Sequence, residues 1–347
     1  MNEFVKIPPL RPEPERDQWG RYVLPDPATG RRASWTRATT LKDALKDKEG
    51  LIGYKQRYAA VGLARMPHLA DRVQALHEEV LSYGKDWRAA APAKDALKDV
   101  LAELHHAAGG DEGSERGTQA HTLTEYADAG RLSEVHFLAT ESELADLQAY
   151  LDRCDQAGIV RPVEWIERIV LNLEVRSAGT FDRLVYLADG RLVCADVKSQ
   201  KDFDFGFLDA AAQMGQYVNA DAMWVDETRS WEPLPANLDR TVGIVMHTPV
   251  GKATCDLYEL DLVEGWESAQ LAYQVREKRA KGKAMGWPYT PPRAASGDRV
   301  LTLIAGAHHP DALAALWRDL DPKGQWTDVH TRAAAARKAE LLEGASR

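Results

Sequence analysis

The stretch that most constrains the fold runs from Leu173 to Gln200. It contains two β-rich runs, 173–187 and 191–197, joined by an Asp189-Gly190 pair. Asp-Gly between two apolar runs is the strongest short-range signal for a β-hairpin, because both residues tolerate the positive φ angles of a tight turn. The sequence therefore predicts a hairpin around which the rest of the chain is organised.

Both predicted strands carry charge where a purely structural strand would place valine or threonine. Asp182 ends a Gly-Thr-Phe-Asp run in the first strand, and Asp196 lies two residues before Lys198 in the second. Residues two apart point to the same face of a strand, so Asp196 and Lys198 leave it together. Two carboxylates and a lysine that converge from one hairpin indicate a divalent-metal site with a cation beside it.

The pairing register decides whether Asp182 joins this group. A two-residue loop pairs Asp182 with Val197 and turns it away from Asp196, whereas a three-residue loop or one bulge pairs Asp182 with Asp196. Bulges are common beside active sites because they re-aim side chains. We therefore expect an irregularity in this hairpin.

The charged motifs match a known family. Gly179-Thr180-Phe181-Asp182 followed by Asp196-Val197-Lys198 resembles the core signature of the PD-(D/E)XK nucleases and, more narrowly, of the RecB-type exonuclease branch, which includes many bacteriophage exonucleases. Two further motifs of that branch occur in order: Gly117-Thr118-Gln119-Ala120-His121 upstream and Gln213-Met214-Gly215-Gln216-Tyr217 downstream. Asp-x-Lys alone is a weak pattern, but four motifs in order are a strong signal. The resemblance covers about residues 100–225.

The resemblance implies an α/β fold. Its core would be restriction-endonuclease-like, with a central mixed β-sheet flanked by helices, and helical additions would stand at both ends. Proline and glycine breaks divide the chain into segments. We expect an extended arm over 1–34, an N-terminal helical region over 35–95, the nuclease core over 96–290 and a C-terminal helical appendage over 297–347, with a break at 288–292.

Capping residues and apolar periodicity predict the individual elements. One helix is expected from a cap at Thr39 or Thr40 to Lys48, and another from a cap at Thr118 to Gly130. Further helices are expected over about 51–64, 68–81, 92–108, 141–157, 208–221, 264–279 and 310–320 and from about 331, and further strands over 163–171, 241–247 and 255–260.

A metal site follows from the residue types and the resemblance. Asp182, Asp196 and His121 would hold one or two Mg²⁺ or Mn²⁺ ions, with the Val197 carbonyl beside them, because carboxylates bind hard cations and an imidazole suits Mn²⁺. Family members often place a further acid upstream of the hairpin, and Glu167 is the candidate here. The alternative for Glu167 is a surface acid on a half-solvated strand.

The remaining motif residues would act on the reaction itself. Lys198 would orient or deprotonate the attacking water and stabilise the negative charge that develops. By resemblance, Gln213 and Tyr217 would contact DNA phosphates or support Lys198, although the sequence shows only that they share a helical face. The three scattered cysteines cannot supply the four-cysteine iron–sulfur cluster of some RecB-type relatives, so we expect no such cluster.

The resemblance thus implies a metal-dependent deoxyribonuclease. We expect an exonuclease that acts at duplex ends, in recombination or repair in a phage or bacterial host. A single-strand nuclease or nickase on the same site is the alternative among enzymes, and a non-catalytic DNA-binding protein that retains the fold is the alternative outside them. The expected partners are DNA and a single-strand annealing or recombination protein.

The net charge of −9 at first argues against DNA as a partner, but a groove can be locally basic in an acidic protein. Two stretches qualify. The stretch 271–293 carries Arg276, Lys278, Arg279, Lys281, Lys283 and Arg293, and its Trp287 and Tyr289 would stack on bases. The other carries Lys42, Lys46, Lys48, Lys55 and Arg57, diluted by acids, and a solvated charged face explains it equally well.

The sequence also predicts a compartment. No apolar run approaches the roughly 18–20 residues needed to span a bilayer, and the N-terminus lacks the charged-then-apolar pattern of a signal peptide. We expect a soluble protein of the cytoplasm, that of the host if the chain is phage-encoded, with no membrane partner. The sequence does not specify an oligomeric state.

Overall fold

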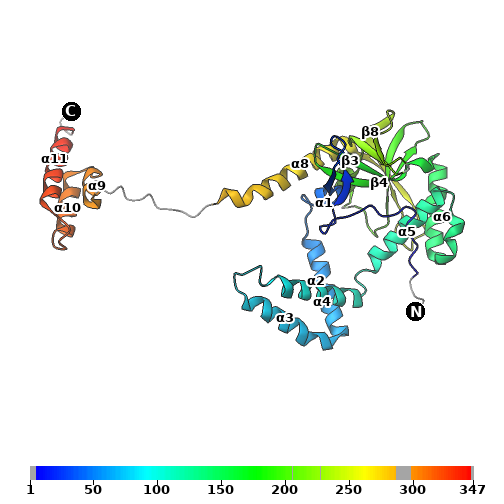
Figure 1. Cartoon of the computed structure of the whole chain (residues 1–347), viewed down its shortest axis with the longest axis horizontal. Helices are drawn as coiled ribbons and strands as arrows, with labels where there is room; N and C mark the ends of the chain where they lie inside the picture. The colour runs from blue at the N-terminus through cyan, green and yellow to red at the C-terminus, as the bar shows by residue number, and fades with distance from the viewer. Residues whose placement is uncertain (1–4, 205, 227, 287–297, 345–347) are drawn as a thin grey trace. The chain divides into compact units, whose positions relative to one another are not determined.

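The computed structural model of the chain describes residues 5–204, 206–226, 228–286 and 298–344. It divides into two compact units, residues 1–280 and 281–347, which are described separately below. The larger unit confirms the predicted α/β class, since it contains a mixed central sheet flanked by helices (Figure 1).

The sheet holds nine strands among the described residues, and its main path runs β7-β6-β3-β4-β5-β8-β9. Strand β5 pairs with β8 in parallel and with β4 in antiparallel orientation, which makes the sheet mixed. The strands of the main path are β3 Ile166–Asn172, β4 Ser177–Tyr186, β5 Leu192–Lys198, β6 Ala222–Val225, β7 Ser230–Glu232, β8 Leu238–His247 and β9 Asp256–Asp261.

The β4–β5 hairpin has the register that brings Asp182 opposite Asp196. The ladder pairs Arg183 with Ala195 and Tyr186 with Leu192, and the loop has three residues, with Gly190 at φ 87°. The hairpin ladder ends at Arg183, so the strands separate at the two aspartates. A further register shift lies between β5 and β8. The predicted irregularity is therefore present as a three-residue loop.

The first strand of this hairpin is shorter than predicted. Residues 173–176 form a turn between β3 and β4, and β4 begins only at Ser177. The side chain of Asn172 accepts a hydrogen bond from the Val175 N–H at 3.2 Å, and Arg176 adopts a positive φ of 50°. An asparagine that bonds the backbone a few residues on favours a turn over a continuing strand. The prediction of strand from Leu173 was wrong for this reason.

Helices pack on the sheet through two separate buried clusters. Val185 and Val193 belong to a cluster shared with α5 (Glu112–Asp128) and α6 (Glu141–Gln156). Leu184 and Cys194 belong to a cluster shared with α7 (Phe207–Val218). Adjacent strand residues thus enter different clusters, as the alternation of side chains along a strand requires. Helix α8 (Leu262–Lys281) packs on α7, where a Cβ on Gly215 would lie 2.7 Å from the backbone of Trp266.

Helix α5 begins earlier than predicted. Thr118 lies inside it, and its hydroxyl donates to the carbonyl of Ser114 one turn back at 3.0 Å. The predicted Thr118 cap was therefore wrong, although the helix that carries His121 is present as predicted. By contrast, α6 begins with a capping box in which Thr140 and Glu143 satisfy each other's backbone N–H groups, at the position that the sequence predicts.

The N-terminal region contains strands as well as helices. The arm predicted over 1–34 contains β1 (Tyr22–Pro25) and the start of β2 (Arg32–Arg37), which runs into the region predicted as helical. These two strands form a hairpin, and β2 also pairs in parallel with β4. Helix α1 (Ala38–Lys42) is short and does not reach Lys48, contrary to the prediction. The predicted helical layer follows as α2 (Glu49–Arg65), α3 (Ala70–Ser82) and α4 (Ala91–Ala107), which pack around Leu69, Val100 and Leu104.

The smaller unit is helical, with its own core. Its helices are α9 (Arg299–Ala305), α10 (Pro310–Leu320) and α11 (Asp328–Gly344), and Val300, Ile304, Ala307 and Leu313 are buried among them. The break predicted at 288–292 lies outside the described residues. No helix in the described part of the chain is both long and apolar enough to cross a membrane.

Candidate functional site

The predicted carboxylates lie where β4 and β5 separate. Asp182 is buried, and its Oδ2 accepts a hydrogen bond from the Val197 N–H at 2.7 Å. The Val197 N–H thus donates to a side-chain carboxylate in place of the next backbone carbonyl of the hairpin ladder. Asp196 is only 1% exposed and lies on the strand that Asp182 contacts. The splayed strand ends thus hold two buried acids next to each other.

Asp196 and Lys198 form an ion pair, with Oδ2 and Nζ 2.5 Å apart. Burial raises the pKa of Asp196, and the lysine only partly offsets this effect. Burial alone would lower the pKa of Lys198, but Asp196 and Asp182 outweigh it and raise that pKa. The other carboxylate oxygen of Asp196, Oδ1, has no hydrogen-bond partner within the described residues. A buried carboxylate with an unused oxygen is a ready ligand for a cation.

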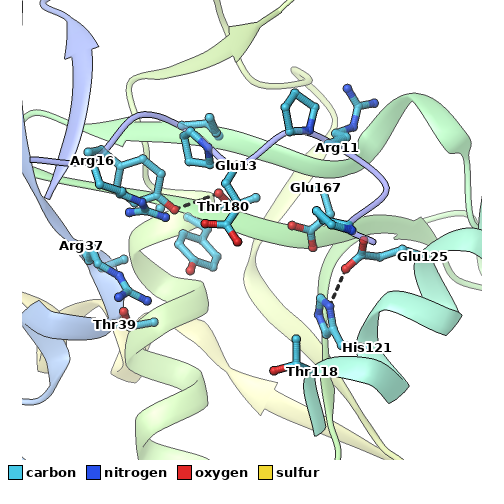
Figure 2. Close-up of a pocket in the computed structure, with 18 of the residues that line it drawn as sticks. Arg11, Glu13, Arg16, Arg37, Thr39, Thr118, His121, Glu125, Glu167 and Thr180 are labelled. Atoms are coloured by element: carbon cyan, nitrogen blue, oxygen red, sulfur yellow. Dashed lines mark hydrogen bonds and ion pairs between the residues drawn. The ribbon is translucent and has the colours of Figure 1, made fainter. Parts of the chain in front are cut away.

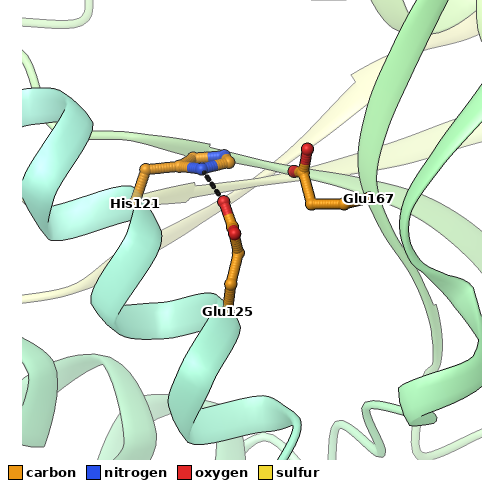
Figure 3. A group of neighbouring side chains, drawn as sticks. All are labelled: His121, Glu125 and Glu167. Carbon is orange, nitrogen blue, oxygen red and sulfur yellow. Dashed lines mark hydrogen bonds and ion pairs between the residues drawn. The ribbon is translucent and has the colours of Figure 1, made fainter. Parts of the chain in front are cut away.

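His121 links α5 to the hairpin. Its Nε2 lies 2.7 Å from Asp182 Oδ2, and its Nδ1 lies 2.6 Å from Glu125 Oε1 one turn along the helix (Figure 3). Burial would lower the pKa of His121, but Asp182, Glu125 and Glu167 together raise it well above its usual value. The imidazole is therefore held between carboxylates from two different elements, and its ring orientation is set by both.

Glu167 joins this group from β3. The register that pairs Ile166 with Arg183 and Arg168 with Phe181 places Glu167 opposite Asp182. Its backbone has a φ of 52°, a strained conformation for a non-glycine residue. Burial is the main cause that raises its pKa to about 8. Strain and a displaced pKa at one acid are typical of a functional site.

His121, Glu125 and Glu167 offer one donor atom each within 4.8 Å of one another, which makes them a candidate metal-binding group among the described residues (Figure 3). Asp182 contacts this group through His121, whereas Asp196 lies outside it and is close enough to Asp182 for that carboxylate to raise its pKa. Glu125 was not predicted as a ligand. Its spacing of four residues from His121 on one helix is the sequence signal that indicates it.

We refer to these six residues as the carboxylate cluster: His121, Glu125, Glu167, Asp182, Asp196 and Lys198. Four of them are acids and two are bases, so negative charge is in excess even when the imidazole is protonated. A site of this composition is suited to a divalent cation.

Gln213 and Tyr217 lie on α7, and the Gln213 side-chain amide donates to the Tyr217 hydroxyl at 3.0 Å. The ring of Tyr217 packs on Gly179 of the Gly-Thr-Phe-Asp motif, where an added Cβ would lie only 2.4 Å from a ring carbon. A glycine is therefore required at 179. The shared helical face predicted for the two residues is confirmed, and it is turned toward β4.

Two cavities border the site. The first, about 520 Å³, is lined by His121, Glu125 and Glu167, by Gln213 and Tyr217, and by residues of the N-terminal arm (Figure 2). The second, about 500 Å³, is lined by Lys198, Gln200, Asp209 and Gln213, together with Lys42 and Lys46. Gln213 borders both cavities, so they adjoin at this residue.

The two basic stretches have different positions. Lys42 and Lys46 approach Asp209 at 3.1 and 2.9 Å, on the wall of the cavity that contains Lys198. The basic residues of the stretch 271–293 that lie on α8 line neither cavity in the described part of the chain. They are Arg276, Lys278, Arg279 and Lys281. Trp287, Tyr289 and Arg293 lie outside the described residues, as does the side chain of Lys283.

A second buried charge group, which the sequence did not indicate, lies next to the first. We call it the arginine cluster: Thr124, Asp128, Tyr150, Arg161 and Arg183. The guanidinium of Arg183 donates to Asp128, to the Tyr150 hydroxyl and, at 3.1 Å, to the Thr124 hydroxyl. Arg161 Nε lies 2.9 Å from the other oxygen of Asp128. Since Thr124 and Asp128 belong to α5 and Arg183 to β4, this cluster fixes the helix that carries His121.

A comparison with protein-family models found no match, and no curated protein matches the chain. Among solved structures, the chain is similar to one described as the crystal structure of SSO0001; the TM-score is 0.22 and the identity 15%, and the match covers 46% of this chain and 67% of that chain. A likeness of this size identifies neither a family nor a function.

Proposed function

We propose that the protein is a metal-dependent DNA exonuclease of the RecB type, with a restriction-endonuclease-like core. One observation carries the proposal: residues from three separate sequence motifs meet at the point where β4 and β5 separate. His121 contacts Asp182, and Asp196 pairs with Lys198 on the neighbouring strand. Such an arrangement has little value for stability, because it leaves acidic groups buried without sufficient counter-charge.

The residues present fit a hard divalent cation. Asp196 offers a buried oxygen with no hydrogen-bond partner within the described residues, and the cluster holds more acids than bases. Asp182, Asp196, His121 and the Val197 carbonyl would hold Mg²⁺ or Mn²⁺, with Glu167 as a further acid. The bound ion would lower the pKa of a water molecule and neutralise charge on the scissile phosphate.

The protein side chains would do the rest. The Lys198 ammonium, 24% exposed, would face the reacting phosphate and stabilise the negative charge that develops there. Glu125 fixes the ring of His121 through Nδ1, which is the usual way in which an outer carboxylate orients a histidine ligand. Gln213 and Tyr217 would position the substrate strand between the two cavities.

The setting would be DNA end processing in recombination or repair, in a bacterial cell or a phage-infected one. Partners would be DNA itself and a single-strand annealing or recombination protein. The cytoplasm is the matching compartment. These parts of the proposal rest on the resemblance described above.

The proposal is tested by incubating end-labelled linear duplex DNA and the same DNA as a closed circle, with Mg²⁺, with Mn²⁺ or with a chelator. We expect nucleotides to be released from the linear form only, and only with the metal. Asp196→Asn is the matched control, because it keeps the size of the side chain and removes its charge. Nicking of the circle would instead favour the nickase alternative, and binding without cleavage would favour the non-catalytic one.

A further inference from the structure

A segment of the N-terminal arm crosses the cavity that contains His121 (Figure 2). We call residues 7–16 the strap. Six strap residues line that cavity: Pro9, Arg11, Pro12, Glu13, Pro14 and Arg16. In Figure 2 the strap passes over the pocket, and Glu13 projects from it toward the interior. The opposite wall consists of His121, Glu125 and Glu167 from the site itself.

The strap is attached firmly at its first end. Ile7 is 2% exposed and packs in the buried cluster shared by α5, α6 and the sheet. Its N–H donates to the side chain of Gln119, itself buried on α5, at 3.2 Å. Ile7 therefore anchors the start of the strap, and Leu10 packs partly buried against the same cluster.

The other end is attached to the opposite side of the cavity. Arg16 pairs with Tyr22 in a β-bridge, and its guanidinium lies 3.5 Å from the centre of the Tyr22 ring. The Val23 N–H donates to the Glu15 carbonyl at 3.0 Å, and the Tyr22 hydroxyl bonds Thr180 Oγ1 at 2.8 Å, two residues before Asp182. The strap therefore spans from α5 to the β1–β4 side of the site.

Between these ends the strap is stiff. Pro9, Pro12 and Pro14 each fix φ near −65° and lack an N–H, so the segment favours an extended conformation that needs no internal hydrogen bonds. A stiff segment held at both ends forms a permanent wall. It differs from a loop that folds over a ligand only after binding.

We propose that the strap closes one side of the catalytic cavity, so that a DNA strand enters by its end and a strand that continues past the site is excluded. This inference rests on the proposed nuclease function and explains its restriction to ends. The cavity of about 520 Å³ is of the size that encloses one small ligand, such as a terminal nucleotide. The strand beyond the cut would continue on the other side of Gln213, along the lysine-lined cavity, where Lys42 and Lys46 would face its phosphates.

Release of the anchor tests the proposal. Ile7→Ser removes the apolar anchor, and Val5→Ser is the matched control, since it makes a similar change two residues away at a side chain that is 51% exposed. A second variant lacks residues 1–8 and so removes the anchor altogether. The substrates are a circular single-stranded DNA, the same molecule linearised, and a linear duplex, each with Mn²⁺.

We expect the Ile7→Ser and truncated proteins to cut the circle roughly tenfold or more faster than the wild type and Val5→Ser, because the burial that holds the wall in place is removed. Cleavage of linear DNA should stay near the wild-type value, and thermal unfolding should remain cooperative, at a midpoint lowered only by the loss of the buried Ile7 side chain. Circles that remain uncut while linear DNA is degraded would overturn the strap proposal and leave the nuclease function standing. Loss of all cleavage in a folded variant would also overturn it, because the strap would then belong to the catalytic machinery. A wild type that degrades no linear DNA would refute the nuclease function instead.

Discussion

The carboxylate cluster and the arginine cluster meet at consecutive residues of β4, Asp182 and Arg183, yet they are built in opposite ways. In the arginine cluster, one oxygen of Asp128 accepts from Tyr150 and Arg183, and the other lies beside Arg161. The side chains of Asp128 and Arg183 are 0% exposed. Each charge there has an opposite charge or a hydroxyl against it, although Asp128 Oδ1, Arg161 Nη1 and Arg183 Nε have no hydrogen-bond partner within the described residues.

The carboxylate cluster is left open. Here too a buried oxygen, Asp196 Oδ1, lacks a hydrogen-bond partner within the described residues, but the side chains of His121 and Lys198 are 26% and 24% exposed. Acids outnumber bases, and burial raises the pKa of Glu167 to about 8, which is the response of a buried acid without enough counter-charge. Buried charge thus has two uses in this molecule: a closed group holds elements together, whereas an open one is kept for a ligand.

The largest expected effect is on catalysis. Asp196→Asn should lower the cleavage rate by about 10³-fold or more, because it removes a charge that the cation requires. Its unfolding midpoint should change little, since the Lys198 ammonium can turn to solvent. Single-turnover cleavage and calorimetry measure the two quantities, and Asp182→Asn should behave in the same way. Full activity in either variant would refute the two-carboxylate site.

A substitution in the arginine cluster should lower the stability of the protein, whereas one in the carboxylate cluster should lower its catalytic rate. Arg183→Met should lower the free energy of unfolding by about 3–5 kcal/mol, because Asp128 keeps only Arg161 as counter-charge and has no route to water. Arg191→Met is the control: its side chain is 41% exposed and pairs with Asp189 at the surface, so it should cost less than about 1 kcal/mol. Urea denaturation of both variants makes the comparison. Equal losses would show that the arginine cluster does not hold α5 on the sheet.

Lys198 separates catalysis from binding. Lys198→Ala should lower the single-turnover rate by on the order of 10²–10³ and leave the affinity for DNA in Ca²⁺ nearly unchanged. Lys198→Arg should restore the rate only in part, because a guanidinium is a planar fork that stays protonated and cannot act as a base. Wild-type cleavage by Lys198→Ala would make the Asp-x-Lys match a coincidence.

A bound cation should raise the free energy of unfolding only while the carboxylate cluster is intact. With Mn²⁺ at 100 times its dissociation constant, the wild type should gain about 2.7 kcal/mol in free energy of unfolding, since a ligand that binds only the folded state stabilises it by mass action. Asp196→Asn should gain much less, whereas Arg191→Met should gain as much as the wild type. Thermal unfolding with Mn²⁺ and with a chelator tests this. An equal shift in all three proteins would place the cation elsewhere.

The smallest effects concern DNA binding outside the clusters. The slope of the logarithm of the DNA-binding constant against the logarithm of salt concentration should become less negative for each phosphate that the protein no longer neutralises. The change should be about 0.7 per phosphate for a single strand and about 0.9 for a duplex, because fewer counterions are released. The Lys42→Gln, Lys46→Gln double variant should show this, and so should neutralisation of Arg276, Lys278, Arg279 and Lys281 together. An unchanged slope in either protein would assign that stretch to the solvated surface.

Features that depend on neighbouring residues could be predicted from the sequence. Asp189-Gly190 predicts the turn of the hairpin, and the spacing of Asp196 and Lys198 predicts a shared strand face, which their 2.5 Å ion pair confirms. The helix expected over 141–157 is present as α6, and the capping box that starts it is equally local, since Thr140 and Glu143 lie three residues apart. In each case the determining residues lie within a few positions of one another.

Elements were predicted wrongly where the neighbouring residues gave no structural signal or suited two different structures. The start of α5 was missed because residues 112–116 carry no apolar stripe and include a glycine, which disfavours helix when considered alone. The turn at 173–176 was missed because its residues also suit a strand. The hydrogen bond from the Val175 N–H to the Asn172 side chain favours the turn. Glu125 lies one helical turn from His121, but only the approach of β3 and β4 gives that helix face a function.

Contacts between distant parts of the chain were set by tertiary packing. Arg183 finds Asp128 at a separation of 55 residues, and Ile7 finds Gln119 at a separation of 112. Neither periodicity nor spacing predicts contacts over such separations. From the sequence, a buried arginine therefore resembles a surface residue, and the strap resembles an arm without tertiary contacts. Their positions become defined only when the sheet and α5 pack together, because burial and counter-charge are properties of that packing.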